Sequence, residues 1–201
     1  MNALILVDVQ NDFLPGGNLP VENGFTIFPA VNFIQEKFDL VVATQDWHPA
    51  DHKSFASNHP GSKEFDEIQL DGLNQVLWPG HCIQQSFGAE FSNQLDTKKI
   101  EAIFRKGMDK EIDNYSGFFD NGKKKATGLA SYLAGRKVSS VFVAGLAADF
   151  CVYFTAMDAL DLGFNASIIT DATMAIDNKS LQSKFDFFVS KGGLLVNSQD
   201  I

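Results

Sequence analysis

The sequence V-F-V-A-G-L-A-A-D-F-C-V at residues 141–152 predicts a strand, a turn and the start of a helix. The β-branched and aromatic run Val141–Val143 is typical of a buried strand, and Gly145 interrupts it. We expect Asp149 to cap the helix, because an aspartate there accepts hydrogen bonds from the free N–H groups of the first turn. This pattern places Cys151 in the first helical turn, at the carboxyl end of a strand.

The position of Cys151 favours a reactive thiolate. The helix dipole stabilises negative charge at this end of a helix, and the free N–H groups there bind anions. A free thiol has a pKa of about 8.5, and we expect this position to lower it. The alternative is that Cys151 is a small buried core residue, which is the usual fate of cysteine. A disulfide with Cys82 is a second alternative, and it would block chemistry at Cys151.

Length and composition exclude several classes of protein. The 201 residues suit a single domain, and a 45% apolar content with 19 phenylalanines is enough for one core. The net charge of −9 argues against binding to nucleic acid or to an anionic membrane. No apolar run approaches the roughly 20 residues of a membrane span, and the first residues lack the basic region of a signal peptide. Two cysteines do not make a disulfide framework, so we expect a reducing, cytoplasmic location.

Segments typical of strands and helices alternate along the chain. We expect strands at Asn2–Val7, Leu40–Thr44, Ile100–Arg105, Val141–Val143, Asn165–Ile169 and Leu194–Val196. We expect helices at Phe28–Phe38, at Thr127–Gly135, from Asp149 onward and at Asn178–Ser190. The alternation predicts a three-layer α/β/α fold, in which helices cover both faces of a mostly parallel sheet of about six strands. Within this single domain, residues 1–201, the irregular segment at about 46–98 is a loop insertion, and loops of this length are usually functional.

Four of the predicted strands run into side chains that carry chemistry. These side chains are Asp8, Asp46, Lys106 and Cys151. Ligands bind beyond the carboxyl ends of the strands in such a sheet, so we expect the four to meet at one edge. Together they supply a thiol, a base for its proton and a cation that stabilises thiolate and carboxylate. Three of them have ordinary alternatives: turn capping for Asp8, solvation for Lys106 and a core position for Cys151.

Histidines in the insertion add possible metal ligands. Asp46 and His48 occupy alternate residues, so their side chains point the same way in an extended chain. His81 follows a Trp-Pro-Gly segment with a constrained backbone. One carboxylate and two imidazoles leave positions open for water or substrate, as catalytic metal sites do. His52 is a further ligand, a hydrogen-bond donor to substrate or a surface residue, and a Cys–His pair with Cys151 also stays open.

The order of these motifs resembles the pyrazinamidase/nicotinamidase family of the isochorismatase-like hydrolases. The matching segments are V-D-V-Q-N-D-F at 7–13, T-Q-D-W-H-P at 44–49, L-W-P-G-H-C at 77–82, K-G at 106–107, D-N-Y-S-G-F at 113–118 and A-G-L-A-A-D-F-C-V at 144–152. They span nearly the whole chain. The cysteine segment marks the superfamily alone, whereas the Asp-Trp-His and Trp-Pro-Gly-His segments are more specific, because metal-free relatives lack them.

The resemblance implies a catalytic role for several matching residues. Asp8, Lys106 and Cys151 correspond to the catalytic triad of the family. The peptide bond between Leu146 and Ala147 is expected to be cis. The backbone N–H groups of Ala147 and Cys151 are expected to form the oxyanion hole.

The resemblance also implies a metal site and a site for an aromatic ring. Asp46, His48 and His81 are expected to bind one divalent ion, with Zn²⁺ as the expected metal and Fe²⁺ or Mn²⁺ as alternatives. In the family this ion also takes the pyridine nitrogen of nicotinamide. Phe13 and Trp78 are expected to sandwich the pyridine ring.

Three positions differ or vary within the family. Ala148 stands where the family often has Thr, and Phe150 stands where it often has Tyr or His. Neither change removes a catalytic group, although the hydroxyl absent at Ala148 is expected to loosen the loop. His52 matches a position that is a fourth metal ligand in some members and not in others.

The reaction that the resemblance implies is hydrolysis of nicotinamide to nicotinate and ammonia through a cysteine thioester, a step of NAD salvage. Pyrazinamide has a ring of similar shape, so we expect it to be accepted as well. Two alternatives stay open: a hydrolase of the superfamily that acts on another small amide, and a catalytically silent module that binds a small molecule or a metal. The sequence does not distinguish a monomer from a homo-oligomer.

Overall fold

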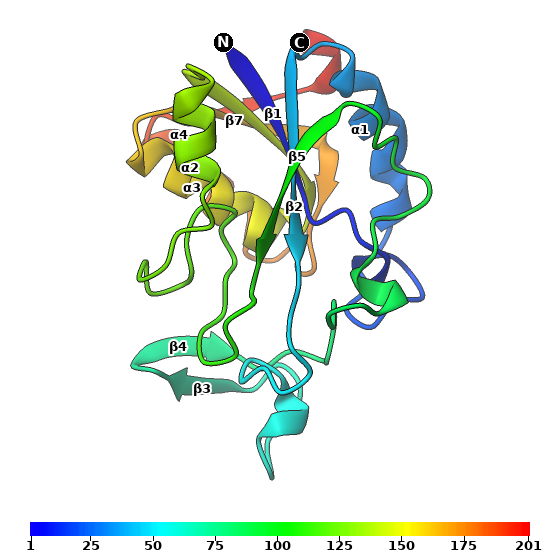
Figure 1. Cartoon of the computed structure of the whole chain (residues 1–201), viewed down its shortest axis with the longest axis vertical. Coiled ribbons are helices and arrows are strands. Elements are labelled where there is room, and N and C mark those ends of the chain that lie inside the picture. The colour runs from blue at the N-terminus through cyan, green and yellow to red at the C-terminus, as the bar shows by residue number, and fades with distance from the viewer.

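A six-stranded parallel sheet runs through the centre of the computed structural model, which describes residues 1–201 (Figure 1). The strand order is β5-β2-β1-β6-β7-β8, and every neighbouring pair is parallel. The strands are β1 (Asn2–Val7), β2 (Leu40–Asp46), β5 (Ile100–Lys106), β6 (Ser140–Leu146), β7 (Asn165–Met174) and β8 (Leu194–Val196). The predicted fold class is confirmed, and the bounds of β1 and β8 are those expected from the sequence.

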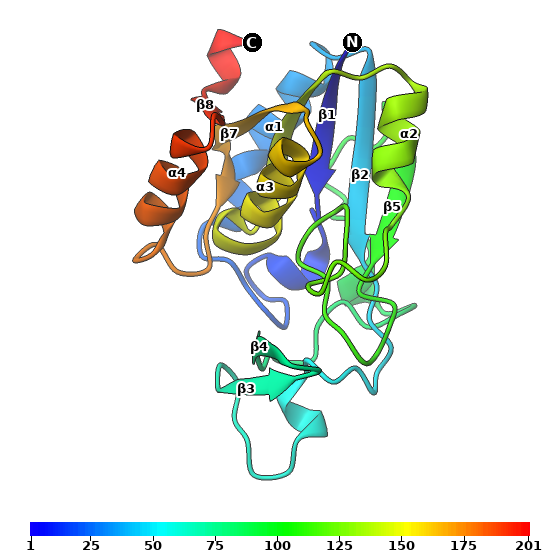
Figure 2. The ribbon, with the colours of Figure 1, turned by 90° about the vertical axis from the view of Figure 1, so that its left-hand side faces the viewer.

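Helices cover both faces of the sheet and make three layers (Figure 2). One face carries α1 (Phe28–Gln35), and the other carries α2 (Leu129–Gly135), α3 (Tyr153–Asp161) and α4 (Leu181–Ser190). Alternate residues of β1 serve the two layers: Leu4 and Leu6 belong to the core under α1, whereas Ile5 and Val7 belong to the opposite core. No helix combines the length and the apolar composition that a membrane span requires.

The turn that carries Cys151 differs from the sequence expectation. A single π-helical turn, Ala148–Val152, joins β6 to α3, and Val152 N–H donates to the Ala147 carbonyl at 3.1 Å. Asp149 is not the cap of this helix. Its fully buried carboxylate instead accepts the backbone N–H groups of Ile176 and Asp177, both at 2.9 Å. Asp149 makes this tertiary contact rather than capping the helix, because those two N–H groups need a hydrogen-bond acceptor in the interior.

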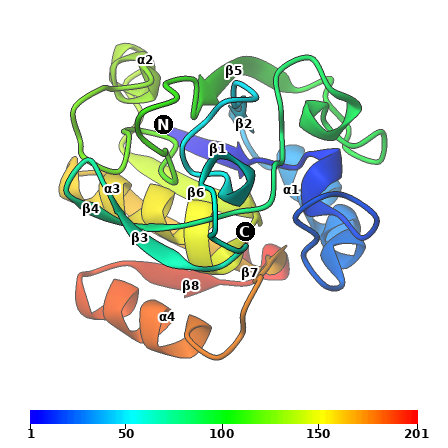
Figure 3. The same ribbon diagram turned by 90° about the horizontal axis from the view of Figure 1, so that it is seen from below.

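The insertion at about 46–98 lies below the carboxyl ends of the strands (Figures 1 and 2). It contains a hairpin, β3 (Glu67–Leu70) and β4 (Leu73–Val76), where the sequence expectation was irregular structure only. The connecting Asp71 and Gly72 have φ angles of 51° and 79°, and two such residues favour a tight hairpin turn. Seen from below, the hairpin lies in front of α3 (Figure 3).

Short 3-10 turns complete the connections between these elements. They lie at Asn11–Phe13, Gly24–Ile27, Ala56–Asn58, Phe87–Ala89 and Ser198–Asp200. The first of them follows β1 directly and carries Phe13 into the space below the sheet. The carboxyl ends of β1, β2, β5 and β6 therefore face a space enclosed by loops and by the insertion.

Candidate active site

The predicted convergence at the carboxyl edge of the sheet is present in the structure. Asp8 follows β1, Asp46 ends β2, Lys106 ends β5 and Cys151 lies in the turn after β6. All four side chains are buried. The carboxylates of Asp8 and Asp46 and the sulfur of Cys151 each present an atom within 4.8 Å of the others. Four distant parts of the chain thus form one polar cluster.

The carboxylate of Asp8 lies beside Lys106 and the Cys151 thiol. The residue has a φ of 49°, which turns the chain sharply at the end of β1. Its Oδ1 accepts a hydrogen bond from Thr44 Oγ1 at 2.7 Å. Its Oδ2 lies 2.9 Å from Lys106 Nζ but receives no hydrogen bond of good geometry. One buried carboxylate oxygen is therefore left to accept a proton.

Lys106 is the central cation of the cluster. Its Nζ donates to Asp46 Oδ1 at 2.7 Å and to the Asn114 carbonyl at 2.9 Å. The same nitrogen lies 3.5 Å from Cys151 Sγ. Burial alone would lower the pKa of Lys106, but the carboxylates of Asp46 and Asp8 raise it well above its ordinary value. The ammonium therefore stays charged beside the thiol.

The expected lowering of the Cys151 pKa is not found. Burial raises the pKa of this thiol well above its ordinary value; Lys106 lowers it, but the Asp8 and Asp46 carboxylates raise it further. Burial also raises the pKa of Asp8, and Lys106 opposes that change. Burial is the largest of these effects, and it outweighs both Lys106 and the helix start. The resting thiol is therefore protonated and lies beside a base.

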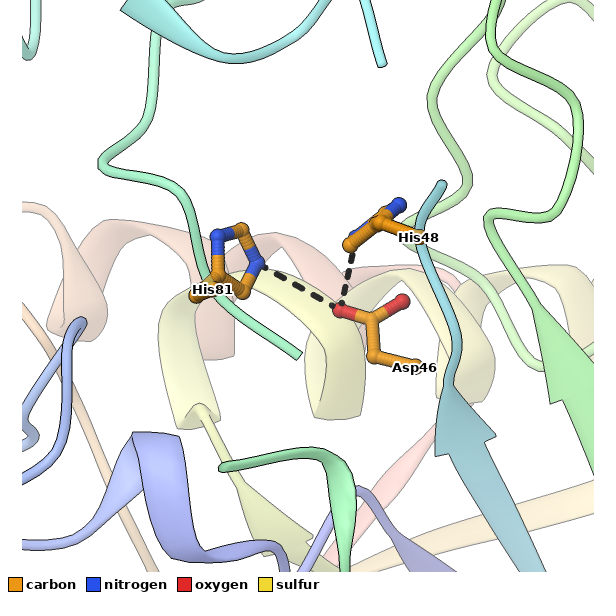
Figure 4. A group of neighbouring side chains, drawn as sticks. All are labelled: Asp46, His48 and His81. Atoms are coloured by element: carbon orange, nitrogen blue, oxygen red, sulfur yellow. Dashed lines mark ion pairs between the residues drawn. The ribbon is translucent and has the colours of Figure 1, made fainter. Parts of the chain in front are cut away.

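Asp46, His48 and His81 form a second cluster beside the first. Asp46 Oδ2 lies 3.3 Å from His48 Nε2 and 3.6 Å from His81 Nε2 (Figure 4). The three side chains are buried, and their donor atoms lie within 4.8 Å of one another. Two imidazole nitrogens and one carboxylate oxygen are a donor set that divalent transition metals accept.

Backbone carbonyls orient both imidazoles. His48 Nδ1 donates to the Gly107 carbonyl at 2.9 Å, and His81 Nδ1 donates to the Pro79 carbonyl at 2.8 Å. With Nδ1 donating, each ring presents its Nε2 to Asp46 Oδ2, and deprotonation of Nε2 makes it available to a metal ion. Outer hydrogen bonds of this kind are typical of metal-binding histidines, so the residues fit a metal ion.

His52 lies beside these residues with a different orientation. Its ring centroid is 4.5 Å from that of His48. Its Nδ1 accepts the backbone N–H of Ser54 at 3.1 Å and lies 2.7 Å from the Ser54 hydroxyl. The ring proton of neutral His52 is thereby assigned to Nε2, an atom that is buried without a hydrogen-bond partner. A protonated Nε2 does not bind a metal, so this arrangement does not support His52 as a fourth ligand.

A small hollow of about 20 Å³ lies beside both clusters. It is lined by Phe13, Leu19, Asp46, Trp78, His81, Asp113, Tyr115, Ala147, Phe150, Cys151 and Ile176. Both residues expected to hold an aromatic ring, Phe13 and Trp78, are in its wall. The Leu146–Ala147 peptide bond is cis, as expected. The Ala147 N–H donates no hydrogen bond within the chain, so it remains free for a ligand.

Two side chains in the segment after β1 support the Asp46 and His81 cluster, although the sequence alone did not predict a role for them. Gln10 donates to the Asp46 carbonyl and accepts the Asp46 N–H, both at 2.8 Å. Asp12 accepts the N–H of Cys82, the neighbour of His81, at 2.7 Å. One feature of the sequence indicates such roles for Gln10 and Asp12. They are polar residues in a segment that continues a buried strand, where polar side chains need internal hydrogen-bond partners.

Phe150, one of the positions that departs from the family pattern, is held by a lysine. It packs edge-on against Trp78, with ring centroids 4.8 Å apart. Lys184 Nζ lies 4.5 Å from the centre of the Phe150 ring and donates to the Asp149 carbonyl. A cation over an aromatic face is stabilising. Lys184 of α4 thus supports the turn that carries Cys151.

Comparison with known proteins finds similarity over the whole chain. The model of the isochorismatase domain family matches residues 2–200. The nicotinamidase of Acinetobacter baylyi is 47% identical, over 99% of this chain and 94% of its own length. The nicotinamidase of Escherichia coli is 43% identical, over 92% of this chain and 88% of its own length.

Solved structures give the same result. The Acinetobacter baumannii nicotinamidase and pyrazinamidase has a TM-score of 0.97 and 46% identity, covering 99% of this chain and 97% of that one. The Pyrococcus horikoshii pyrazinamidase, solved in complex with zinc, has a TM-score of 0.81 and 36% identity, covering 98% of each chain.

Proposed function

Because this chain belongs to the isochorismatase domain family, we infer that it acts as a nicotinamidase, hydrolysing nicotinamide to nicotinate and ammonia in NAD salvage. One observation carries the inference: Asp8 and Lys106 meet Cys151, and Cys151 lines a hollow whose wall also contains Phe13 and Trp78. A thiol, a base and aromatic walls are what an aromatic carboxamide needs. Relatives named nicotinamidase at 47% and 43% identity support the same substrate.

The first half of the reaction forms a thioester. Asp8 accepts the proton of Cys151, and Lys106 stabilises the charges on both groups. The thiolate attacks the carboxamide carbon, and the N–H groups of Ala147 and Cys151 hold the oxyanion. Removal of one such donor typically raises the barrier by about 2.7–4 kcal/mol. The protonated Asp8 then gives its proton to the leaving nitrogen, so the C–N bond breaks and ammonia departs.

The second half returns the enzyme to its starting state. Water enters, and the Asp8 carboxylate accepts its proton while the oxygen attacks the thioester carbon. The C–S bond breaks, nicotinate is released, and the sulfur recovers its proton. The raised pKa values of Cys151 and Asp8 suit these roles, because the proton must move between the two groups in each half-reaction.

We propose that Asp46, His48 and His81 hold one divalent metal ion, with Zn²⁺ expected. The donor set and the carbonyl-oriented imidazoles support a metal, and the zinc complex of the Pyrococcus horikoshii relative supports this choice. When bound, such an ion acts as a Lewis acid that takes a ring nitrogen and so orients the substrate. Phe13 and Trp78 then fix the plane of the ring beside Cys151.

The metal assignment is tested by replacing its ligands. Asp46→Ala and His48→Ala should lose the metal, as measured by elemental analysis, and should raise the KM for nicotinamide. His59→Ala is the matched control, because its ring bonds the Lys53 carbonyl outside the cluster. Metal content equal to wild type in both ligand variants would show that other residues bind the ion.

The substrate is tested by ammonia release from nicotinamide, pyrazinamide and a panel of other small amides. We expect nicotinamide to be hydrolysed with the highest kcat/KM and pyrazinamide to be accepted, as the name of the Acinetobacter baumannii relative indicates for that protein. Preference for an unrelated amide would favour another hydrolase of the superfamily. Lack of turnover on every amide by metal-loaded protein would favour a silent binding module.

Domain organisation and location complete the proposal. We treat residues 1–201 as one domain with a metal-site insertion at about 46–98, and the family match over residues 2–200 supports this. The two cysteines are unpaired, which supports the reducing cytoplasm expected from the sequence.

A further inference from the structure

The hairpin β3–β4 contributes one buried polar side chain to the interior. Gln75 of β4 is 3% exposed, whereas its neighbour Asn74 is exposed. Gln75 Nε2 lies 2.9 Å from Asp113 Oδ2 and 3.0 Å from the Tyr115 hydroxyl, and it also approaches the Val76 carbonyl at 2.7 Å. The amide therefore joins the insertion to the loop that follows β5.

The Tyr115 hydroxyl links the Gln75 amide to Trp78. It accepts the indole N–H of Trp78 at 3.3 Å while it accepts Gln75 Nε2. The hydroxyl oxygen lies within hydrogen-bond distance of two donors, and one of them, the Gln75 amide, shares its two N–H groups among three acceptors. The Tyr115 ring also meets Trp78 edge-on, with centroids 6.2 Å apart. The orientation of the indole plane thus depends on where the Tyr115 hydroxyl is held.

We propose that Gln75 is a positioning residue for substrate affinity, acting through Tyr115 to hold Trp78 against the ring of the substrate. The inference rests on the proposed function, in which Trp78 is one wall of the ring site. Asp113, Tyr115 and Trp78 line the hollow, whereas Gln75 does not, so any effect of Gln75 on affinity is indirect. The hairpin then has a function, because it supplies the Gln75 amide that aligns Trp78 in the wall of the ring site.

Loss of the Gln75 amide removes two partners at once. Asp113 is buried, and its Oδ2 loses a side-chain donor. Burial and the Asp113 carboxylate raise the pKa of Tyr115 well above its ordinary value, so its hydroxyl stays neutral. Without Gln75 this hydroxyl is free to turn its proton toward Asp113, which weakens its role as acceptor for Trp78.

The kinetic test compares Gln75→Leu with Gln69→Leu. Gln69 is an exposed residue of β3 in the same hairpin, where it pairs with Asn74. We expect Gln75→Leu to raise the KM for nicotinamide by roughly three- to tenfold, the effect of one or two hydrogen bonds, with kcat changed less than about twofold. Gln69→Leu should match wild type. A KM within twofold of wild type, or equal falls in kcat and kcat/KM, would overturn the proposal.

A double-mutant cycle tests whether Gln75 acts through Tyr115. Tyr115→Phe keeps the ring that faces Trp78 and removes only the hydroxyl that links the two side chains. If the pathway is correct, Gln75→Leu adds little to the KM of the Tyr115→Phe protein, because the coupled pair is already broken. Fully additive effects on KM would contradict the pathway.

Tryptophan fluorescence tests the contact without turnover. In a Trp47→Phe background, Trp78 is the only tryptophan, because the chain has two. Gln75→Leu should shift its emission to longer wavelength and increase quenching by acrylamide, whereas Gln69→Leu should change neither. Unchanged emission and quenching in Gln75→Leu would overturn the inference even if nicotinamide is hydrolysed. Absence of ammonia release by the wild-type protein would instead count against the proposed function.

Discussion

The buried ammonium of Lys106 contacts two carboxylates and a thiol. It lies 2.7 Å from Asp46 Oδ1, 2.9 Å from Asp8 Oδ2 and 3.5 Å from Cys151 Sγ. Burial explains why the thiol pKa is raised although a cation lies beside the sulfur, and the two carboxylates add to it. In the proposed mechanism the nucleophile is therefore generated when Asp8 takes the proton of Cys151, rather than stored as a thiolate.

The charge of Asp8 has two opposite effects, which Asp8→Asn separates. Because the Asp8 carboxylate raises the pKa of Cys151, its removal should lower that pKa while Lys106 remains. Alkylation of Cys151 by iodoacetamide should then rise at lower pH than in wild type. The same variant lacks the proton acceptor, so kcat for nicotinamide should fall by about 10²–10⁴-fold.

The two readouts distinguish this account from simple damage to the site. A misfolded site would lose turnover, and its alkylation of Cys151 would not show the expected shift to lower pH. A shift of the alkylation profile to higher pH in Asp8→Asn, or turnover close to wild type, would contradict the roles given to Asp8.

At the scale of elements, the loop after β5 packs closely against His48, which follows β2. Gly107 has a φ of 68°, and a Cβ built on it would lie 2.3 Å from His48 Cε1. Gly107 also supplies the carbonyl that His48 Nδ1 contacts. The segments after neighbouring strands β2 and β5 thus supply the proposed metal ligand His48 and the backbone carbonyl that orients it.

Gly107→Ala should displace His48 and weaken metal binding by about 10–100-fold, the effect typical of losing an outer hydrogen bond. Titration with a competing chelator measures this affinity. Gly128→Ala is the matched control, because Gly128 has a φ of 95° but open space around its Cβ position. It shares the backbone strain of a positive φ without the clash at His48. Equal metal affinity in Gly107→Ala and wild type would contradict this reading of the loop.

Strand positions were predictable from the sequence because each strand is a buried run with a clear end. Asn2–Val7 and Leu194–Val196 matched the structure, and the strand-end rule located Asp8, Asp46, Lys106 and Cys151. The hairpin was missed, although its signal, Asp71-Gly72 between short alternating segments, is a local one. Both of its four-residue strands have only a partly buried face, so hydrophobicity alone did not mark them.

Contacts between distant segments were beyond what the sequence predicts. Asp149 looked like a helix cap because local propensity favours that role, yet its partners are 27 and 28 residues away. Gln10 and Gln75 find their partners only once the insertion has packed under the sheet. The raised pKa of Cys151 likewise depends on burial, and then on the Asp8 and Asp46 carboxylates that folding brings beside the thiol.

At the scale of the whole molecule, the sheet and the insertion contribute different residues to the site. The sheet edge supplies Asp8, Lys106 and Cys151, and the insertion supplies His81 and Trp78. Asp46 belongs to both parts, because one oxygen accepts from Lys106 and the other faces the two imidazoles. Chemistry and substrate orientation are thus joined through one carboxylate.

The central claim is that the sulfur of Cys151 attacks the carboxamide. The most direct measurement is ammonia release from nicotinamide by Cys151→Ala with its metal content measured in the same preparation. We predict metal content equal to wild type and a kcat lower by at least about a thousandfold, because no other group in the cluster replaces the nucleophile. Ammonia release at the wild-type rate by this variant would contradict the account.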